Sequence, residues 1–178
     1  MDKKIFAPIL AILLSAAILL GAYNGLMGIA NDIAETELLG KMQTMLPGSS
    51  TFEIEEYTGD DANIQTVYKS ENGYVLMTQT SGYAGPIHVL VGVNNEGKVT
   101  GLQVRRMEET LGLGGEIHTD WEFLAQFLNT AGDAEVGSTI DAITGATVTS
   151  KAVTRCVNSA VGYVTGVDAV SEATSWGG

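Results

Sequence analysis

The sequence predicts an α+β protein: an N-terminal transmembrane helix followed by a single domain with a mostly antiparallel sheet and packed helices. An apolar run opens the chain at Ile5–Met27. Four β-rich segments with short connections lie between residues 66 and 105, and apolar residues recur at helical spacing across Lys151–Val164. The 178 residues leave room for one domain plus an anchor. We expect four parts: a transmembrane anchor at 1–29, a stalk or first domain helix at 30–48, the domain at 49–166 and a flexible tail at 167–178.

The first segment has the features of a membrane anchor. Ile5–Asn31 contains no charged side chain, and its apolar part exceeds the ~20 residues that cross a bilayer as a helix. Lys3 and Lys4 precede the run and acidic residues follow it, which predicts a cytoplasmic N-terminus and a domain on the extracytoplasmic side. A cleaved signal peptide is the alternative, but the run is long for one and no Ala-x-Ala site follows Leu20. We therefore expect a single-pass protein of the cell membrane.

A second helical stretch is expected at Ala30–Leu46, where Pro47-Gly48 ends it. Its apolar side would contain Ile33, Leu38, Met42 and Met45. Residues 51–63 are acidic and polar, which indicates a short strand or a loop.

Four strands are expected next, at Thr66–Lys69, Tyr74–Thr80, Ile87–Val93 and Val99–Arg105. Asn72-Gly73 separates the first two and is a strong hairpin signal, and Asn94–Gly97 separates the last two in the same way. Connections this short exclude crossover helices, so the sheet should be mostly antiparallel. Alternate residues of the third strand form one apolar face: Ile87, Val89, Val91 and Val93.

Two helices should pack on this sheet. Trp121–Leu128 is rich in aromatic and aliphatic side chains and is expected to be a core helix. The last helix carries a stripe of apolar residues: Val153, Val157, Ala160, Val161 and Val164. Cys156, the only cysteine, lies on that apolar side, which indicates a small buried hydrophobic residue.

The ten residues Asp141–Ser150, Asp-Ala-Ile-Thr-Gly-Ala-Thr-Val-Thr-Ser, concentrate small hydroxylated side chains beside glycine and alanine. They lie where the N-cap of the last helix is expected. A helix N-terminus offers N–H groups and a positive dipole end, which together favour a phosphate. Gly145 and Ala146 leave room for close backbone approach. A capped helix and turn without a ligand is the alternative interpretation.

Two glycine-rich segments precede the motif. Gly82–Ile87, Gly-Tyr-Ala-Gly-Pro-Ile, is a bend between two expected strands. Glu108–Gly115 contains closely spaced glycines typical of a loop that approaches a ligand or another backbone, although it lacks the Gly-x-Gly-x-x-Gly pattern of dinucleotide-binding loops.

Composition excludes several functions. The formal net charge is -12 with only nine Lys and Arg residues, which argues against nucleic-acid binding and against docking on anionic lipid. One cysteine excludes an intramolecular disulfide or a cysteine-based metal cluster within the chain. His88 and His118 have no metal-ligand spacing and are expected on a strand and in a loop. We expect no metal site and no catalytic residues.

Asp141–Ser150 resembles the flavinylation motif of the FMN-binding domain family, and Gly82–Ile87 and Glu109–Gly114 resemble two further segments of that family. The order and spacing of the three suit the family throughout residues 50–165. In this family a flavin transferase takes FMN from FAD and esterifies its phosphate to the last threonine of the Ser/Thr-Gly-Ala-Thr core. The resemblance implies covalent FMN, held as a phosphoester-threonine at Thr147. It also implies that Asp141 takes part in recognition by the transferase.

The resemblance also implies a flavin pocket. Thr147 would carry the flavin, and the other residues expected to bind or surround it are Asp141, Thr144, Gly145, Ala146, Thr149, Ser150, Tyr83, Glu109, Thr110, Leu113 and Gly114. Tyr83 would pack against the ring; alternatively, it covers the sheet edge.

Within the family, a short chain with one N-terminal membrane helix is similar to the G subunit of Rnf complexes, which couple electron transfer between ferredoxin and NAD to sodium or proton movement. The resemblance implies an electron-carrying subunit with other membrane subunits of an Rnf-type complex as partners. Three alternatives remain: a C-subunit-like part of the sodium-translocating NADH:quinone reductase, a stand-alone extracellular flavoprotein electron carrier, or a flavin-free anchored adhesion or pilin-like module.

Overall fold

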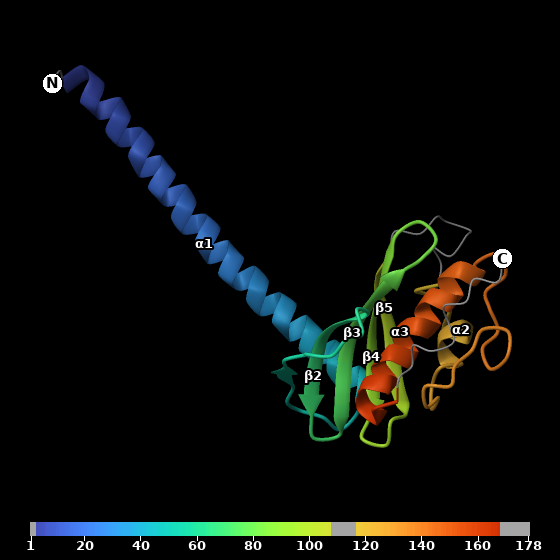
Figure 1. The fold of residues 1–178 in the computed structure, drawn as a ribbon. Coiled ribbons are helices and arrows are strands. Elements are labelled where there is room, and N and C mark those ends of the chain that lie inside the picture. The colour runs from blue at the N-terminus through green and yellow to red at the C-terminus, as the bar shows by residue number, and fades with distance from the viewer. Residues whose placement is uncertain (1–2, 108–116, 168–178) are drawn as a thin grey trace. The chain divides into compact units, whose positions relative to one another are not determined.

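The structure is a computed structural model that describes residues 3–107 and 117–167 (Figure 1). Its element order is α1, β1 to β5, α2 and α3. The chain divides into two compact units, Met1–Lys41 and Met42–Gly178. The α+β class expected from the sequence is confirmed.

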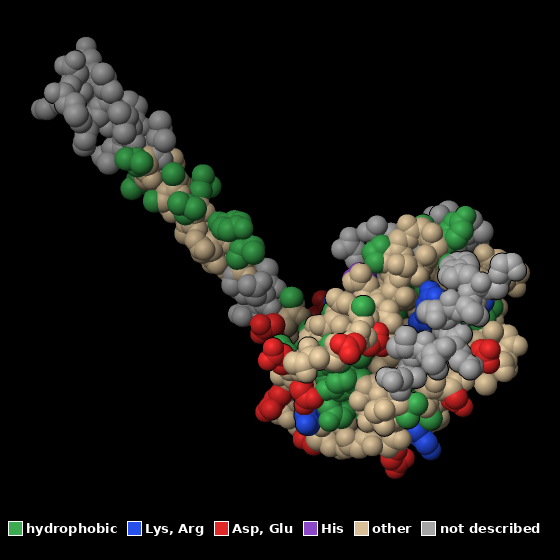
Figure 2. All heavy atoms as spheres, in the orientation of Figure 1, with side chains coloured by type: hydrophobic (Ala, Val, Ile, Leu, Met, Phe, Trp, Pro, Cys, Tyr) green, Lys and Arg blue, Asp and Glu red, His purple; other side chains and the backbone are tan. Residues whose placement is uncertain are grey.

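The first unit is helical. Helix α1 spans Lys3–Met45 without a break, so the expected anchor and the expected second helix belong to one element. Between residues 13 and 27 its large apolar side chains are exposed, as the green spheres along the helix in Figure 2 show, with Leu19 at 69% and Leu26 at 68%. Among the described residues, no helical stretch meets the length and hydropathy expected of a bilayer-spanning segment.

The second unit is built on a five-stranded antiparallel sheet in the order β1-β2-β3-β4-β5. The strands are β1 Glu53–Glu55, β2 Ile64–Ser70, β3 Gly73–Ser81, β4 Pro86–Asn94 and β5 Val99–Met107. The four long strands include the four expected from the sequence. Each strand pairs antiparallel with the next strand in the sequence, because the connections between them are short.

The first hairpin differs in detail from its prediction. Ser70 pairs with Gly73, so Glu71 and Asn72 form the turn and the glycine starts β3. Gly73 has φ +146°, and a Cβ there would lie 2.2 Å from the carbonyl oxygen of Val93 on β4. The glycine is therefore required by the neighbouring strand as well as by the turn.

The main core lies between one face of the sheet and helices α2 and α3, with α3 crossing β3 and β4 (Figure 1). Helix α3 spans Thr147–Thr165 and buries its apolar stripe, including Val153, Val157 and Cys156. The expected face of β4 is fully buried, with Val89 and Val91 at 0% exposure. Burial of this apolar face stabilises the fold by about 25 cal/mol per Å² of apolar area removed from water.

The opposite face of the sheet receives the end of α1. Met42 and Met45 are buried, and the Met45 carbonyl accepts a hydrogen bond from Thr100 Oγ1 at 2.6 Å. Gly92 on β4 and Gly101 on β5 are paired beneath it, and a Cβ at Gly92 would lie 2.4 Å from the Met45 oxygen. The glycines thus allow the helix end to reach the sheet. Ile33, predicted on the apolar side of this segment, is instead 62% exposed.

Two helix predictions need correction. Helix α2 spans only Trp121–Ala125. Trp121 is 74% exposed and lies outside the core, whereas Phe123, Leu124 and Phe127 are buried. Helix α3 begins at Thr147, earlier than expected, with Ala146 as an N-cap that makes no side-chain hydrogen bond. Thr147, Thr149 and Ser150 therefore lie inside the first turn of the helix, and only Thr144 precedes it.

A polar and aromatic cluster joins the sheet edge to the end of α3. Tyr163 stacks edge-to-face on Tyr57 and Tyr74, with ring centroids 5.9 and 5.5 Å apart. Its hydroxyl donates to the Glu55 carboxylate on β1, and Lys69 Nζ lies 3.1 Å from the same carboxylate. The bond to Tyr163, and then that to Lys69, lowers the pKa of Glu55 below its ordinary value. Burial, and then the bond to Glu55, raises the pKa of Tyr163.

Candidate functional site

The Thr-Gly-Ala-Thr core of the motif forms a β-turn that leads directly into α3. The Ala146 N–H donates to the Ile143 carbonyl at 2.9 Å, which closes a turn over Ile143–Ala146. Gly145, in the third position, has φ +79°, as a type II turn requires. A Cβ at Gly145 would meet nothing within 4 Å, so the turn leaves open space above its backbone. Glycine is therefore demanded here by the backbone conformation.

Ser150 fixes this turn to the helix. Its Oγ accepts a hydrogen bond from the Ile143 N–H at 3.2 Å and donates to the Ala146 carbonyl at 3.0 Å. Ser150 is fully buried, as is Thr149 beside it. The buried hydroxyl of Ser150 thus replaces the missing N-cap side chain as the bridge between turn and helix.

Asp141, at the start of the motif, is held through its backbone. The Asp141 N–H donates to Gln126 Oε1 at 2.7 Å, and Gln126 Nε2 donates to the Asp141 carbonyl at 3.3 Å. Gln126 is the C-cap residue of α2. The Asp141 residue is exposed, and no hydrogen bond to its carboxylate is recorded among the described residues. Asp141 therefore lies at the surface of the described part of the domain.

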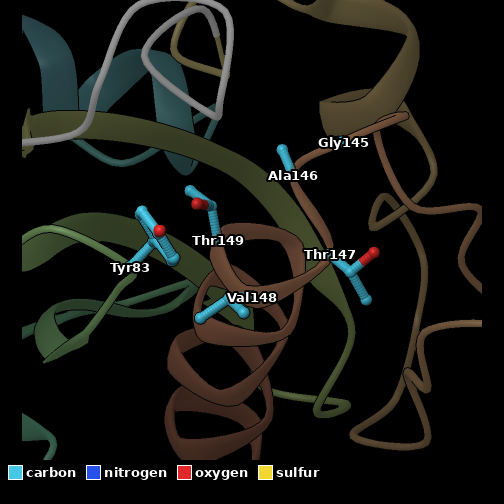
Figure 3. A pocket seen from close by; sticks show the side chains of 6 residues that line it. All are labelled: Tyr83, Gly145, Ala146, Thr147, Val148 and Thr149. Carbon is cyan, nitrogen blue, oxygen red and sulfur yellow. The ribbon is translucent and has the colours of Figure 1, made fainter.

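A cavity of about 310 Å³ lies beside the start of α3. Its lining comes from two distant parts of the sequence: Tyr83, Gly145, Ala146, Thr147, Val148 and Thr149 (Figure 3). The Tyr83 side chain is 64% exposed. Figure 3 shows Tyr83 on the same side as Thr149, whereas the Thr147 hydroxyl points away from both. Thr147 itself is an exposed residue.

The Tyr83 loop is tied to α3. The Gly82 N–H donates to the Gly85 carbonyl at 2.8 Å, which closes the bend between β3 and β4. Arg155 Nη2, on α3, donates to the carbonyl of Ser81 at 3.4 Å, at the last residue of β3. These contacts hold the bend next to the helix that carries the motif.

The charges around the motif favour an anion at the start of α3. The first turn of α3 contains no acidic residue, and the positive end of the helix dipole lies at Thr147. Lys151 is exposed one turn further along.

The thiol of Cys156, further along α3, does not belong to this site. Burial raises its pKa to about 12, which disfavours the reactive thiolate.

The structure brings together one part of the predicted site. Tyr83 joins Gly145, Ala146, Thr147 and Thr149 at the cavity. Asp141, Thr144 and Ser150 do not line it: the first two are exposed, and Ser150 is buried beneath the turn. The predicted residues Glu109, Thr110, Leu113 and Gly114 lie outside the described residues.

Three further residues take part that sequence reasoning did not identify. Gln126 holds Asp141, Arg155 holds the Tyr83 bend, and Val148 lines the cavity. Of these three residues, only Val148 could be suspected from the sequence, because it lies inside the motif. The other two act through side-chain contacts to distant backbone groups, which leave no periodic pattern.

Residues 82–162 match the FMN-binding domain. The matched stretch begins at the Tyr83 bend and runs through the motif and most of α3. Fold and site thus define a class, that of proteins with an FMN-binding domain.

The G subunits of several ion-translocating complexes are similar to this chain. The G subunit of the ion-translocating oxidoreductase complex of Methanosarcina acetivorans is 37% identical over 139 residues, which cover 69% of this chain and 72% of the relative. The G subunit of the Na(+)-translocating ferredoxin:NAD(+) oxidoreductase complex of Acetobacterium woodii is 40% identical over 98 residues, 50% of this chain and 47% of the relative. The proton-translocating counterpart of Clostridium ljungdahlii is 41% identical over 99 residues, 52% of this chain and 53% of the relative.

The chain belongs to the family of G subunits of ion-translocating oxidoreductase complexes. The match spans about half the length of the Acetobacterium and Clostridium relatives.

Proposed function

We propose that this protein is the electron-carrying subunit of an Rnf-type, ion-translocating ferredoxin:NAD oxidoreductase, and that it holds FMN through a phosphoester at Thr147. The observation that carries the proposal is the position of Thr147, exposed at the start of α3 and lining a cavity together with Tyr83. Both belong to the stretch that matches the FMN-binding domain. The names of the relatives supply the complex and the electron partners.

The residues present fit this cofactor. The cavity of about 310 Å³ lies within the range of small-molecule sites, and space is open above the Gly145 backbone. The positive end of α3 suits a phosphate at Thr147. When bound, FMN would supply the redox chemistry, while the protein supplies position and electrostatics.

We assign the site residues distinct roles within this proposal. Thr147 provides the oxygen of the phosphoester, and the turn of Thr144, Gly145 and Ala146 leaves room beside it. Ser150 supports the turn from below, and Thr149 lines the cavity beside Tyr83. Asp141 presents its exposed carboxylate to the flavin transferase.

Tyr83 packs against the ring in this proposal. The loop residues Glu109, Thr110, Leu113 and Gly114 complete the pocket on the strength of the family resemblance.

The N-terminal segment anchors the protein in the cell membrane as a single pass at residues 1–29, with residues 30–48 as a stalk and 49–166 as the FMN-binding domain on the extracytoplasmic side. The uncharged run and the flanking lysines support this topology, as do the exposed apolar side chains of α1 between residues 13 and 27. Other membrane subunits of the complex would be its partners.

The anchor is tested by replacing residues 1–29 with a cleavable export signal. The proposal expects the native chain in the membrane fraction and the replaced chain in the soluble extracytoplasmic fraction, still carrying flavin. A native chain that leaves the membrane in high salt without detergent would contradict the anchor.

The attachment site is tested with two matched variants, Thr147→Val and Thr144→Val, each expressed with the flavin transferase. Both remove one exposed hydroxyl of the same turn region. The proposal expects Thr147→Val to lose all covalent flavin fluorescence in a denaturing gel. Any flavin on the Thr144→Val chain should map to the Thr147 peptide. Full fluorescence in Thr147→Val would place the attachment at another residue. A native chain without any flavin would favour the alternative of a flavin-free anchored module.

A further inference from the structure

The side-chain amide of Gln126 contacts the backbone of Asp141 in both directions. Its Oε1 accepts from the Asp141 N–H at 2.7 Å, and its Nε2 donates to the Asp141 carbonyl at 3.3 Å. The amide therefore satisfies both polar backbone groups of one loop residue, as a neighbouring strand would. Two simultaneous bonds restrict both the position and the orientation of that residue.

Gln126 projects from a firmly held support. It caps α2, whose N-terminus is closed by Asp120 Oδ1 accepting from the Phe123 N–H at 2.9 Å. The residue after it, Phe127, is fully buried, and its ring lies 5.2 Å from that of Phe123. Gln126 thus connects the α2 segment to a loop whose apolar residues Ile140 and Ile143 also pack against the core.

Two side chains, those of Gln126 and Ser150, hold the backbone of the motif, and the exposed residues of the motif lie beside the held positions. Gln126 holds Asp141, and Ser150 Oγ holds the Ile143 N–H at 3.2 Å and the Ala146 carbonyl at 3.0 Å. Asp141, Thr144 and Thr147 are exposed. The backbone of Asp141 and the turn that precedes Thr147 are therefore held in place before any partner arrives.

We propose that Gln126 is a positioning residue for the modification of Thr147, because it holds the motif in the conformation that the flavin transferase docks on. This inference rests on the proposed function. In the reaction, Thr147 Oγ attacks the phosphorus of the FMN half of FAD. The P–O bond to the AMP half breaks, AMP leaves, and the hydroxyl proton passes to a base of the transferase. No electrons are exchanged.

The test measures this reaction on the full chain, purified unmodified in detergent, with purified flavin transferase and FAD. Release of AMP gives KM and kcat for the protein substrate. For Gln126→Ala we expect KM to rise about tenfold, because an Asp141 backbone freed from both bonds must be ordered on docking. The kcat should stay within about twofold, because the bound complex is the same. For Gln126→Glu, which keeps the acceptor for the Asp141 N–H and loses the donor, the rise should be smaller.

The matched control is Gln65→Ala. Gln65 Nε2 also donates to a local backbone carbonyl, that of Ala62 at 3.2 Å, but it does not contact the motif. Its KM should equal that of the wild type. Gln126→Ala should lower the thermal midpoint more than Gln65→Ala does, because it removes two hydrogen bonds instead of one, while both chains stay folded at the assay temperature. A synthetic peptide of residues 139–152 lacks Gln126, and its KM should be closer to that of Gln126→Ala than to that of the wild-type chain.

Two results would overturn the inference while leaving the proposed function intact: an unchanged KM in Gln126→Ala, or a peptide modified as efficiently as the folded chain. A fall in kcat at unchanged KM would also overturn it, since Gln126 would then act after docking. A wild-type chain that the transferase leaves unmodified would instead overturn the proposed function itself.

Discussion

Tyr83 and Thr147 lie far apart in the sequence and line the same cavity, one from the bend between β3 and β4 and the other from the first turn of α3 (Figure 3). The bend is held near α3 by the bond from Arg155 to the Ser81 carbonyl. The Thr147 hydroxyl points away from Tyr83, so an attached flavin would reach this aromatic side chain once the Thr147 side chain turns toward the cavity.

Replacing Tyr83 should change the flavin without removing it. In Tyr83→Ala the ring would lose its aromatic neighbour, so we expect higher flavin fluorescence per bound flavin and a shifted absorption maximum at unchanged covalent occupancy. Trp121→Ala is the control, because Trp121 is also an exposed aromatic side chain and does not line the cavity. Identical spectra for Tyr83→Ala and the wild type would remove Tyr83 from the site.

Ser150→Ala should loosen the motif. The substitution removes the acceptor of the Ile143 N–H and the donor to the Ala146 carbonyl. We expect a loss of about 1–3 kcal/mol in the free energy of unfolding, measured in urea on the unmodified chain, together with lower flavin occupancy. Ser159→Ala is a matched control, since this buried α3 serine accepts one bond from Asn63 and does not contact the motif. Equal flavin occupancy in both variants would contradict the role of Ser150.

Gly92→Ala should displace the end of α1. Its Cβ would lie 2.4 Å from the Met45 carbonyl oxygen, which cannot move without breaking the bond from Thr100. We expect a loss of about 1–3 kcal/mol in stability, as for overpacked core positions. Gly40→Ala, where a Cβ meets nothing within 4 Å, should leave stability unchanged or raise it by up to about 1 kcal/mol. Similar unfolding midpoints for Gly92→Ala and the wild type would show that the helix end does not pack there.

The bond between Tyr163 and Glu55 should make stability depend on pH at both ends of the scale. Because the folded-state pKa of Glu55 is lowered from 4.5, its contribution is present above that value and is lost as pH falls below it. Burial, and then the bond to Glu55, raises the pKa of Tyr163 from 10.0, so its contribution is present below that value and declines as pH rises above it. We expect the double-mutant coupling between Tyr163→Phe and Glu55→Gln to be present near pH 7 and to shrink in acid. A coupling independent of pH would contradict this account.

Much of the sheet followed from the sequence because its signals are local. Asn94–Gly97 forms the expected turn, in which the Gly97 N–H donates to the Asn94 carbonyl at 2.9 Å, and alternation on β4 identified a buried face. The end of α1 was harder to predict. Ile33 and Met42 have the same apolar character, and only the position of the sheet decides that Met42 is buried. Gly92 and Gly101 inside strands were the available sign of close backbone approach.

The candidate site was predictable as a motif but not as a geometry. Thr147 and Tyr83 were both named from the family resemblance, and the cavity brings them together. That Ser150 faces inward under the turn follows from the start of α3 at Thr147, whereas the sequence placed the hydroxyl cluster at the cap. Gln126 could not be found, because a glutamine that binds a distant backbone has the same sequence appearance as a solvated one.

The mass of the chain purified from its own membranes tests the central claim most directly. Intact mass spectrometry followed by peptide mapping should show a gain of one FMN minus water, confined to the peptide that contains Thr147. A native chain of unmodified mass, or the same gain on another peptide, would contradict covalent flavin at the start of α3.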